Sequence, residues 1–134
     1  MPSFSWFKRN AHWGLFLLRL FIGLRLIYGV IDNVFSWHKM LEFRDFLQQF
    51  SFPFPLVCAV VSVYAQFLAG LAIILGWKIR LAALLMIINF LVALIMIHRN
   101  QSVEAMTPAL AILFCCILFL FQGAGRMAID KNSS

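Results

Sequence analysis

Four long runs of apolar residues, separated by short polar connections, dominate the chain. The runs cover about residues 13–35, 54–75, 79–97 and 105–121. A helix needs roughly 20 mostly apolar residues to cross a hydrocarbon core about 30 Å thick. Lipid offers no partner to backbone N–H and C=O groups, and the runs lack the alternation of a membrane β-strand. The pattern therefore predicts an all-α integral membrane protein, an antiparallel four-helix bundle forming a single membrane domain over residues 1–134.

The connection between the first two runs has a pattern of its own. Its apolar residues recur at spacings of three and four: Met40, Leu41, Phe43, Phe46, Leu47 and Phe50. That spacing is typical of an amphipathic helix. We expect this helix either to lie along the outer membrane face or to cap the bundle. The segment Phe52-Pro53-Phe54-Pro55 then returns the chain to the bilayer.

The composition excludes a water-soluble fold. Hydrophobic residues make up 63% of the chain and charged residues 12%, against roughly 45–50% and about 25% in soluble domains. The net charge is +6, but the basic residues fall between the apolar runs and form no stripe that would bind nucleic acid. We therefore expect the lipid bilayer as a partner and no nucleic acid.

The distribution of basic residues predicts the orientation. One set of connections and ends carries six of them: Lys8, Arg9, Lys78, Arg80, Arg126 and Lys131. On the opposite side Lys39 and Arg44 are offset by Glu42 and Asp45, and Arg99 stands alone. Cytoplasmic connections carry the excess of Lys and Arg, so both chain ends are predicted to be cytoplasmic, N-in and C-in.

Ionisable residues inside a membrane span mark functional sites by default. Arg19 is near the predicted cytoplasmic end, where its long stem can snorkel to the head groups. Arg25 is about midway along the first run, and Gln66 and Asn89 are midway along the second and third. Small neighbours of these two amides allow close helix approach. We expect a buried layer of Arg25, Gln66 and Asn89, which is either a structural hydrogen-bond clasp or a ligand site. The guanidinium charge would be balanced by Asp32 bending inward, by a water-filled cavity or by an anionic or carbonyl ligand.

A second polar group falls at the outer end of the predicted bundle. Asp32, His38, His98, Arg99 and Glu104 belong to it. Histidines at helix ends are commonly solvated, so no metal or haem site is expected. The group would instead form the mouth of a polar cavity open to the outer face, with Asp32 or Glu104 available as a proton acceptor. The ligand-binding candidates are Arg25, Gln66, Asn89, Asp32, His98 and Glu104, and no catalytic residue is assigned.

Five segments then carry a family resemblance. In chain order they are Leu17-Leu18-Arg19-Leu20 with Gly23 and Tyr28-Gly29, Phe52-Pro53-Phe54-Pro55, Gln66-Phe67-Leu68-Ala69-Gly70 with Leu75-Gly76, Arg80-Leu81-Ala82-Ala83, and Gly123-Ala124-Gly125-Arg126 with Asp130. Together they resemble the DoxX-like membrane proteins. The resemblance implies a multi-pass protein of the bacterial inner membrane. Some members are subunits of thiosulfate:quinone oxidoreductase, and others join complexes linked to thiol and superoxide defence.

The chain departs from that family at two points. Many members carry Glu near the position of Gln66 and Lys shortly after that of Gly29, where this chain has Val30-Ile31-Asp32-Asn33. The leading hypothesis is a membrane subunit of a quinone-linked, sulfur- or thiol-related redox complex. Arg25 and Gln66 would meet a quinone carbonyl or a sulfur oxyanion in the cavity.

The sequence shows no flavin or nicotinamide fingerprint and no Cys-x-x-Cys pair. We therefore expect no cofactor within the chain beyond a bound quinone, and oxidoreductase activity only together with a partner subunit. The alternative is a non-enzymatic membrane module, either binding a small molecule or lipid or assisting the assembly of another membrane protein. A partner subunit or a homo-oligomer is expected in both cases.

Overall fold

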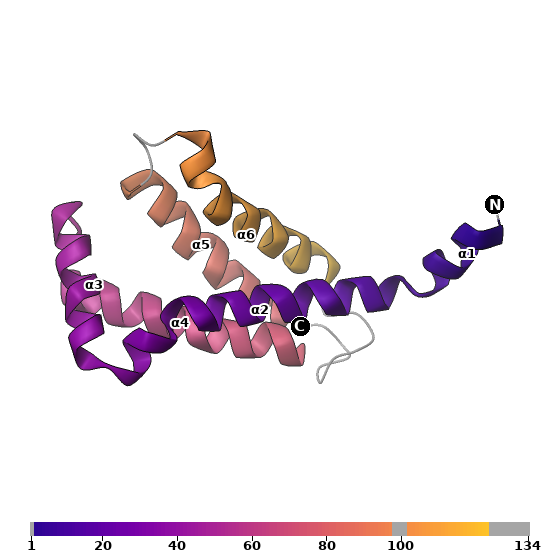
Figure 1. Ribbon diagram of the computed structural model, residues 1–134, viewed down its shortest axis with the longest axis horizontal. Helices are drawn as coiled ribbons and strands as arrows, with labels where there is room; N and C mark the ends of the chain where they lie inside the picture. The colour runs from indigo at the N-terminus through magenta and orange to yellow at the C-terminus, as the bar shows by residue number, and fades with distance from the viewer. Residues whose placement is uncertain (1, 98–101, 124–134) are drawn as a thin grey trace.

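The computed structural model describes residues 2–97 and 102–123, and its regular elements there are all helices (Figure 1). They are α1 (Pro2–Arg9), α2 (Ala11–Phe35), α3 (Trp37–Gln49), α4 (Pro55–Leu75), α5 (Ile79–Met96) and α6 (Val103–Gln122). Four of them, α2, α4, α5 and α6, are long and apolar enough to cross a membrane. Each begins and ends within two residues of the corresponding predicted span. The all-α, multi-pass fold predicted from the sequence is confirmed.

Local sequence signals set the ends of the membrane helices. α4 begins with Pro55, whose fixed φ suits the first helical position. It ends at Leu75 and is followed by Gly76, which adopts the left-handed conformation at φ 72° that glycine reaches without steric cost. α6 begins after Ser102, whose side chain accepts a 3.3 Å hydrogen bond from the backbone N–H of Ala105. The short turn that begins at Gly76 joins α4 to α5 as a helical hairpin.

Two glycines allow α2 and α4 to approach closely. A methyl group added to Gly23 would lie 2.7 Å from the carbonyl oxygen of Gly70, and one added to Gly70 would lie 2.8 Å from the carbonyl oxygen of Gly23. Side-chain carbons of Ile74 and Ile27 are in the way as well, but the two carbonyl oxygens belong to the backbone and cannot turn aside. Only glycine at both positions allows this approach, which is the small-residue packing that membrane helices favour.

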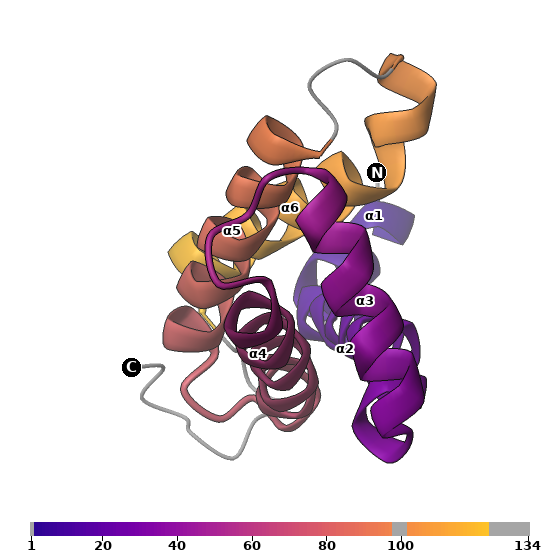
Figure 2. The same cartoon turned by 90° about the vertical axis from the view of Figure 1, so that its left-hand side faces the viewer.

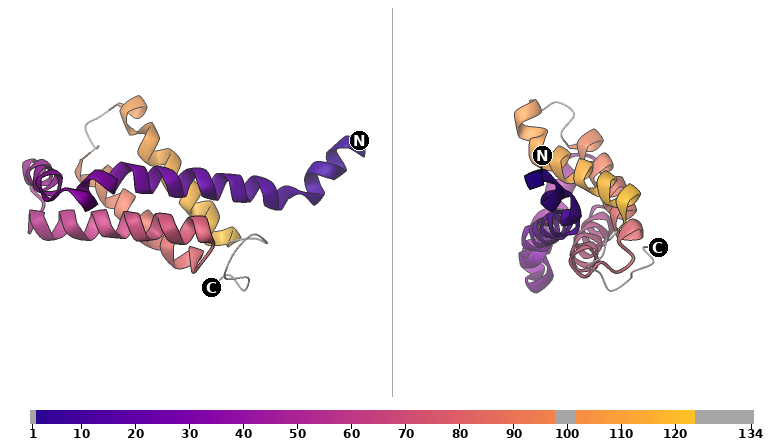
Figure 3. Two further views of the ribbon diagram at one scale, coloured as in Figure 1. Left: turned by 60° about the horizontal axis from the view of Figure 1, so that its bottom comes forward. Right: turned by 90° about the vertical axis from the view of Figure 1, so that its right-hand side faces the viewer.

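The four membrane helices share one core at the end of the molecule that holds the α4–α5 turn, which we name the turn end. Its buried residues come from α2, α4, α5 and α6: Ile22, Leu26, Ala69, Ile73, Ile79, Ala83, Cys116 and Phe119. Away from this end the α5–α6 pair diverges from the α2–α4 pair (Figures 1 and 3). The helices are therefore packed most closely at the turn end.

The opposite end, which we name the α3 end, is closed by α3. This helix runs across the ends of α2 and α4 (Figure 2). Its Met40 and Leu47 are 1% and 4% exposed and pack with Val30, Ala59 and Val63 of the two membrane helices. The helix expected from the three- and four-residue spacing exists, and its apolar face caps the α2–α4 pair.

Replacing Gly23 by alanine should destabilise the fold, because its methyl group would meet the backbone of α4. Overpacking of this kind costs typically about 1–3 kcal/mol, and we expect a clear fall in the melting temperature of the purified protein in detergent. Gly14→Ala is the matched control, since nothing lies within 4 Å of the added methyl group. Alanine favours a helix over glycine by about 1 kcal/mol, so this variant should melt at or above the parent temperature. Equal melting of the two variants would contradict the close contact.

Candidate functional site

Arg19 of α2 is a buried cation in the membrane region. Its side chain is 1% exposed. Nε donates a hydrogen bond of 3.0 Å to the carbonyl oxygen of Ile73, and Nη2 donates one of 2.9 Å to that of Ile74. The guanidinium carbon also lies 5.6 Å from the centre of the Phe16 ring. Arg19 thus binds across from α2 to the last turn of α4.

The partners of Arg19 explain how a cation is held there. The last four carbonyl groups of a helix have no partner within the helix, and together they carry a partial negative charge. Ile73 and Ile74 are in the last turn of α4, so one guanidinium satisfies two of these carbonyls. The expectation that Arg19 snorkels to the head groups is therefore wrong. The sequence could not show it, because the partners are backbone atoms 54 and 55 residues further along.

A second polar cluster joins α4 to α5. The hydroxyl of Ser62 donates a 2.8 Å hydrogen bond to Oδ1 of Asn89, and Nε2 of Gln66 donates one of 3.0 Å to the Ser62 hydroxyl. All three side chains are half-buried. The structure therefore brings Gln66 and Asn89 together as predicted, with Ser62 between them. Ser62 is four residues, about one helical turn, before Gln66, and its role as the link was not predicted from the sequence.

Two amide atoms of this cluster have no partner among the described residues. They are Nδ2 of Asn89, a donor, and Oε1 of Gln66, an acceptor. In that same part of the chain no buried side-chain nitrogen or oxygen lacks a hydrogen bond, so both atoms reach the surface of the protein. The cluster therefore presents one free donor and one free acceptor within the membrane-spanning region.

Arg25 does not join this cluster. It is exposed on α2, and its Nη1 lies beside Gly29, 3.1 Å from where a methyl group on that glycine would be. The buried layer of Arg25, Gln66 and Asn89 is therefore corrected to one of Ser62, Gln66 and Asn89. The face of α2 that packs on α4 carries the buried residues Gly23, Leu26 and Val30. Arg25 projects from a neighbouring face, so its guanidinium stays outside the helix contact.

The remaining candidates do not gather into a cavity mouth in the described chain. Asp32 and Glu104 are both exposed, and His98 lies outside the described residues. His38 pairs instead with Glu42, with 3.2 Å between Nε2 and Oε1. Across residues 2–97 and 102–123 no three His, Cys, Asp or Glu side chains gather in a way that could hold a metal ion.

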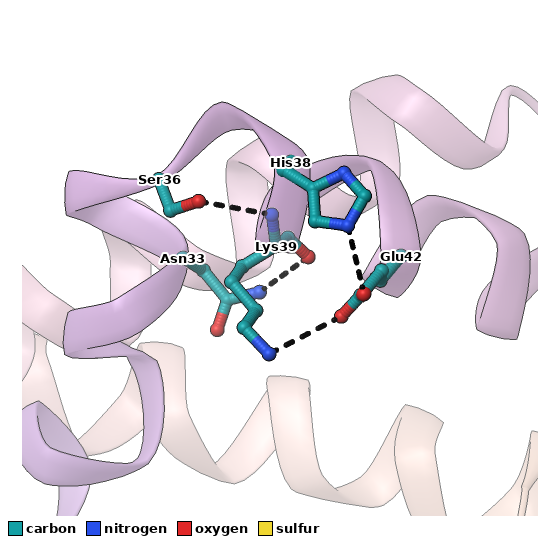
Figure 4. A network of polar contacts seen from close by, with 5 residues as sticks. All are labelled: Asn33, Ser36, His38, Lys39 and Glu42. Carbon is teal, nitrogen blue, oxygen red and sulfur yellow. Dashed lines mark hydrogen bonds and ion pairs between the residues drawn. The ribbon is translucent and has the colours of Figure 1, made fainter.

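The network around His38 secures the junction of α2 with α3 (Figure 4). The Ser36 hydroxyl accepts a 3.3 Å hydrogen bond from the backbone N–H of Lys39 and so caps α3. The amide of Asn33 donates a 3.0 Å bond to the carbonyl oxygen of Lys39. The Lys39 ammonium lies 3.6 Å from Glu42. These contacts are solvent-exposed, so they orient the corner and contribute little stability.

Comparison with known proteins gives one match. The family model of DoxX matches residues 14–99, more than half of the chain, from the first turn of α2 to just beyond α5. No curated protein and no solved structure matches the chain.

Arg19→Leu should unfold or deplete the protein, because it leaves two carbonyls of α4 without their charged partner. Each hydrogen bond to a charged group contributes roughly 1.5–3 kcal/mol, so we expect a loss of about 3 kcal/mol or more. Arg25→Leu is the matched control, being the same substitution on an exposed part of the same helix. It should keep the parent melting temperature and membrane abundance. If the two variants melt alike, Arg19 does not hold α2 to α4.

Proposed function

This chain belongs to the DoxX family, and we propose on that premise that it is a membrane subunit of a quinone-linked redox complex in the bacterial inner membrane. Its part in the complex is to hold the quinone head group inside the bilayer, while a partner subunit carries the electron donor, a sulfur or thiol compound. The quinone is the proposed cofactor. The activity therefore belongs to the complex and not to this chain alone.

The observation that carries the proposal is the pair of free amide atoms of Asn89 and Gln66. An unpaired polar group in hydrocarbon is costly, and lipid tails offer it no partner. Nδ2 of Asn89 would donate a hydrogen bond to a quinone carbonyl, and Oε1 of Gln66 would accept one from a quinol hydroxyl. One free donor and one free acceptor in the same cluster would therefore suit both redox states of the ligand.

The charges support an orientation for this site. Among the described residues, the turn end carries Lys8, Arg9, Lys78 and Arg80. Cytoplasmic ends of membrane proteins are rich in Lys and Arg. We therefore place the turn end in the cytoplasm, N-in and C-in, and the α3 end outside. The helices diverge toward the α3 end (Figure 1), and we expect the quinone to reach the amide pair from the outer half of the bilayer.

A second function is favoured by the position of Arg25. Charged residues in membrane helices almost always face protein or a water-filled cavity, but Arg25 is exposed on α2. A partner chain covering this face would give the guanidinium an acceptor. The chain would then be a non-enzymatic module that docks or assembles another membrane protein, or a homo-oligomer.

A short-chain quinone should stabilise the purified protein through the amide pair. We expect decylubiquinone to raise the melting temperature of the parent, and Asn89→Leu to weaken that binding about tenfold or more, since each neutral hydrogen bond contributes about 1 kcal/mol and the unpaired partner more. Tyr64→Phe is the control, because it removes a hydroxyl from an exposed position of the same helix α4 and should bind quinone like the parent. An equal response of all three proteins would refute the site.

Isolation from native membranes separates the two functions. In mild detergent the quinone-linked complex should retain quinone and a partner subunit, and should reduce added quinone when a sulfur donor such as thiosulfate is supplied. Asn89→Leu should keep the partner and lose the quinone. A preparation that holds a partner and lipid, with neither quinone nor reductase activity, would favour the docking module instead.

A further inference from the structure

A groove at the turn end is separate from the amide pair. It lies between the first turns of α2 and the last turns of α6 and has a volume of about 530 Å³. Its lining includes His12, Gly14, Leu15, Leu18, Leu118 and Gln122. His12 and Gln122 are nearest the helix ends, whereas Leu18 and Leu118 are one turn or more deeper. Both walls therefore change from polar at the mouth to apolar inside.

The groove continues toward α1. A second hollow of about 440 Å³, lined partly by Trp6 and Trp13, shares Ala11 and Gly14 with the first. α1 also carries Phe7 and ends in Lys8 and Arg9. Aromatic rings beside basic residues are typical of a helix lying at the membrane surface. The mouth of the groove is therefore at the level of the lipid head groups.

Among the residues that the structure describes, the charged side chains around the mouth are of one sign. Besides the buried Arg19, the turn end carries in the described chain Lys8, Arg9, Lys78 and Arg80, and no acidic residue. The acidic side chains that the structure describes are at the α3 end: Asp32, Glu42, Asp45 and Glu104. An occupant of the groove therefore meets a positive field at its mouth and apolar walls beyond it.

We propose that this groove binds an anionic phospholipid. The phosphate lies at the mouth beside His12, within reach of the basic end of α1, and one acyl chain runs between Leu18 and Leu118. Basic pockets between membrane helices on the cytoplasmic side are suited to such head groups. The lipid fills the space between α2 and α6 that no side chain of either helix fills.

The test is native mass spectrometry of the whole protein in detergent, titrated with phosphatidylglycerol and with phosphatidylcholine of the same acyl chains. Each basic residue near an anionic head group favours binding by about 1 kcal/mol, or roughly fivefold, so we expect the parent to prefer phosphatidylglycerol at least about tenfold. Equal affinity for the two lipids would overturn the proposal.

Gly14→Leu tests the location. Nothing lies within 4 Å of a side-chain carbon added at Gly14, so the leucine enters the groove without disturbing the helices, and phosphatidylglycerol binding should fall about tenfold or more. Ala105→Leu is the control, with similar added bulk at an exposed position near the other end of α6, and should bind like the parent. If Gly14→Leu keeps its lipid, or loses decylubiquinone instead, the assignment is wrong.

The double variant Lys8→Gln with Arg9→Gln tests the charge. Both residues are exposed, so the fold should not depend on them. We expect the affinity for phosphatidylglycerol to drop to that for phosphatidylcholine, with the latter unchanged. An undiminished preference for phosphatidylglycerol would show that these charges do not select the lipid.

Discussion

The bond between Arg19 and the last turn of α4 depends on the close approach of two helix backbones, and the rest of the arrangement follows from that pair. Arg19 reaches Ile74, and Gly23 meets Gly70. Arg19 and Gly23 are four residues apart on α2, and so are Ile74 and Gly70 on α4. The Arg19 hydrogen bond and the glycine contact are therefore on neighbouring turns of one antiparallel interface. The glycines bring the carbonyls within reach of the guanidinium, and the guanidinium satisfies carbonyls that lipid could not.

The contact between Arg19 and α4 is at the turn end, and the two ends of the molecule differ in how their helices pack. At the turn end, α5 and α6 pack into the same core as α2 and α4. Toward the α3 end the two helix pairs diverge (Figure 3), and α3 covers only the α2–α4 pair. The Ser62 cluster links α4 to α5 one to two turns from Gly70, on the side of the α3 end. The polar cluster can lie there because the tight packing of the four helices is at the turn end.

The membrane spans and α3 could be predicted because they follow from local patterns of apolar residues. The choice between Arg19 and Arg25 could not, since each has a glycine four residues later, at Gly23 and Gly29. The line of residues from Arg19 continues as apolar Leu26 and Val30, whereas that from Arg25 continues as Asp32. In a membrane helix, the face that carries polar residues is the one expected to point into the bundle. Only the pairing with Gly70 decides the matter, and that pairing is a tertiary contact.

The same antiparallel alignment gives Arg25 a definite relation to the amide pair. With Gly23 opposite Gly70, six residues further along α2 correspond to six residues back along α4, so Gly29 is level with Tyr64. Gln66 is two residues away, about 3 Å along the axis. The guanidinium of Arg25 lies beside Gly29 and is therefore at nearly the depth of Gln66. In a medium of low dielectric constant its field extends further than in water. A quinone head group bound by the amides would meet a positive potential. Such a potential favours carbonyl oxygens and oxyanions over cationic ligands.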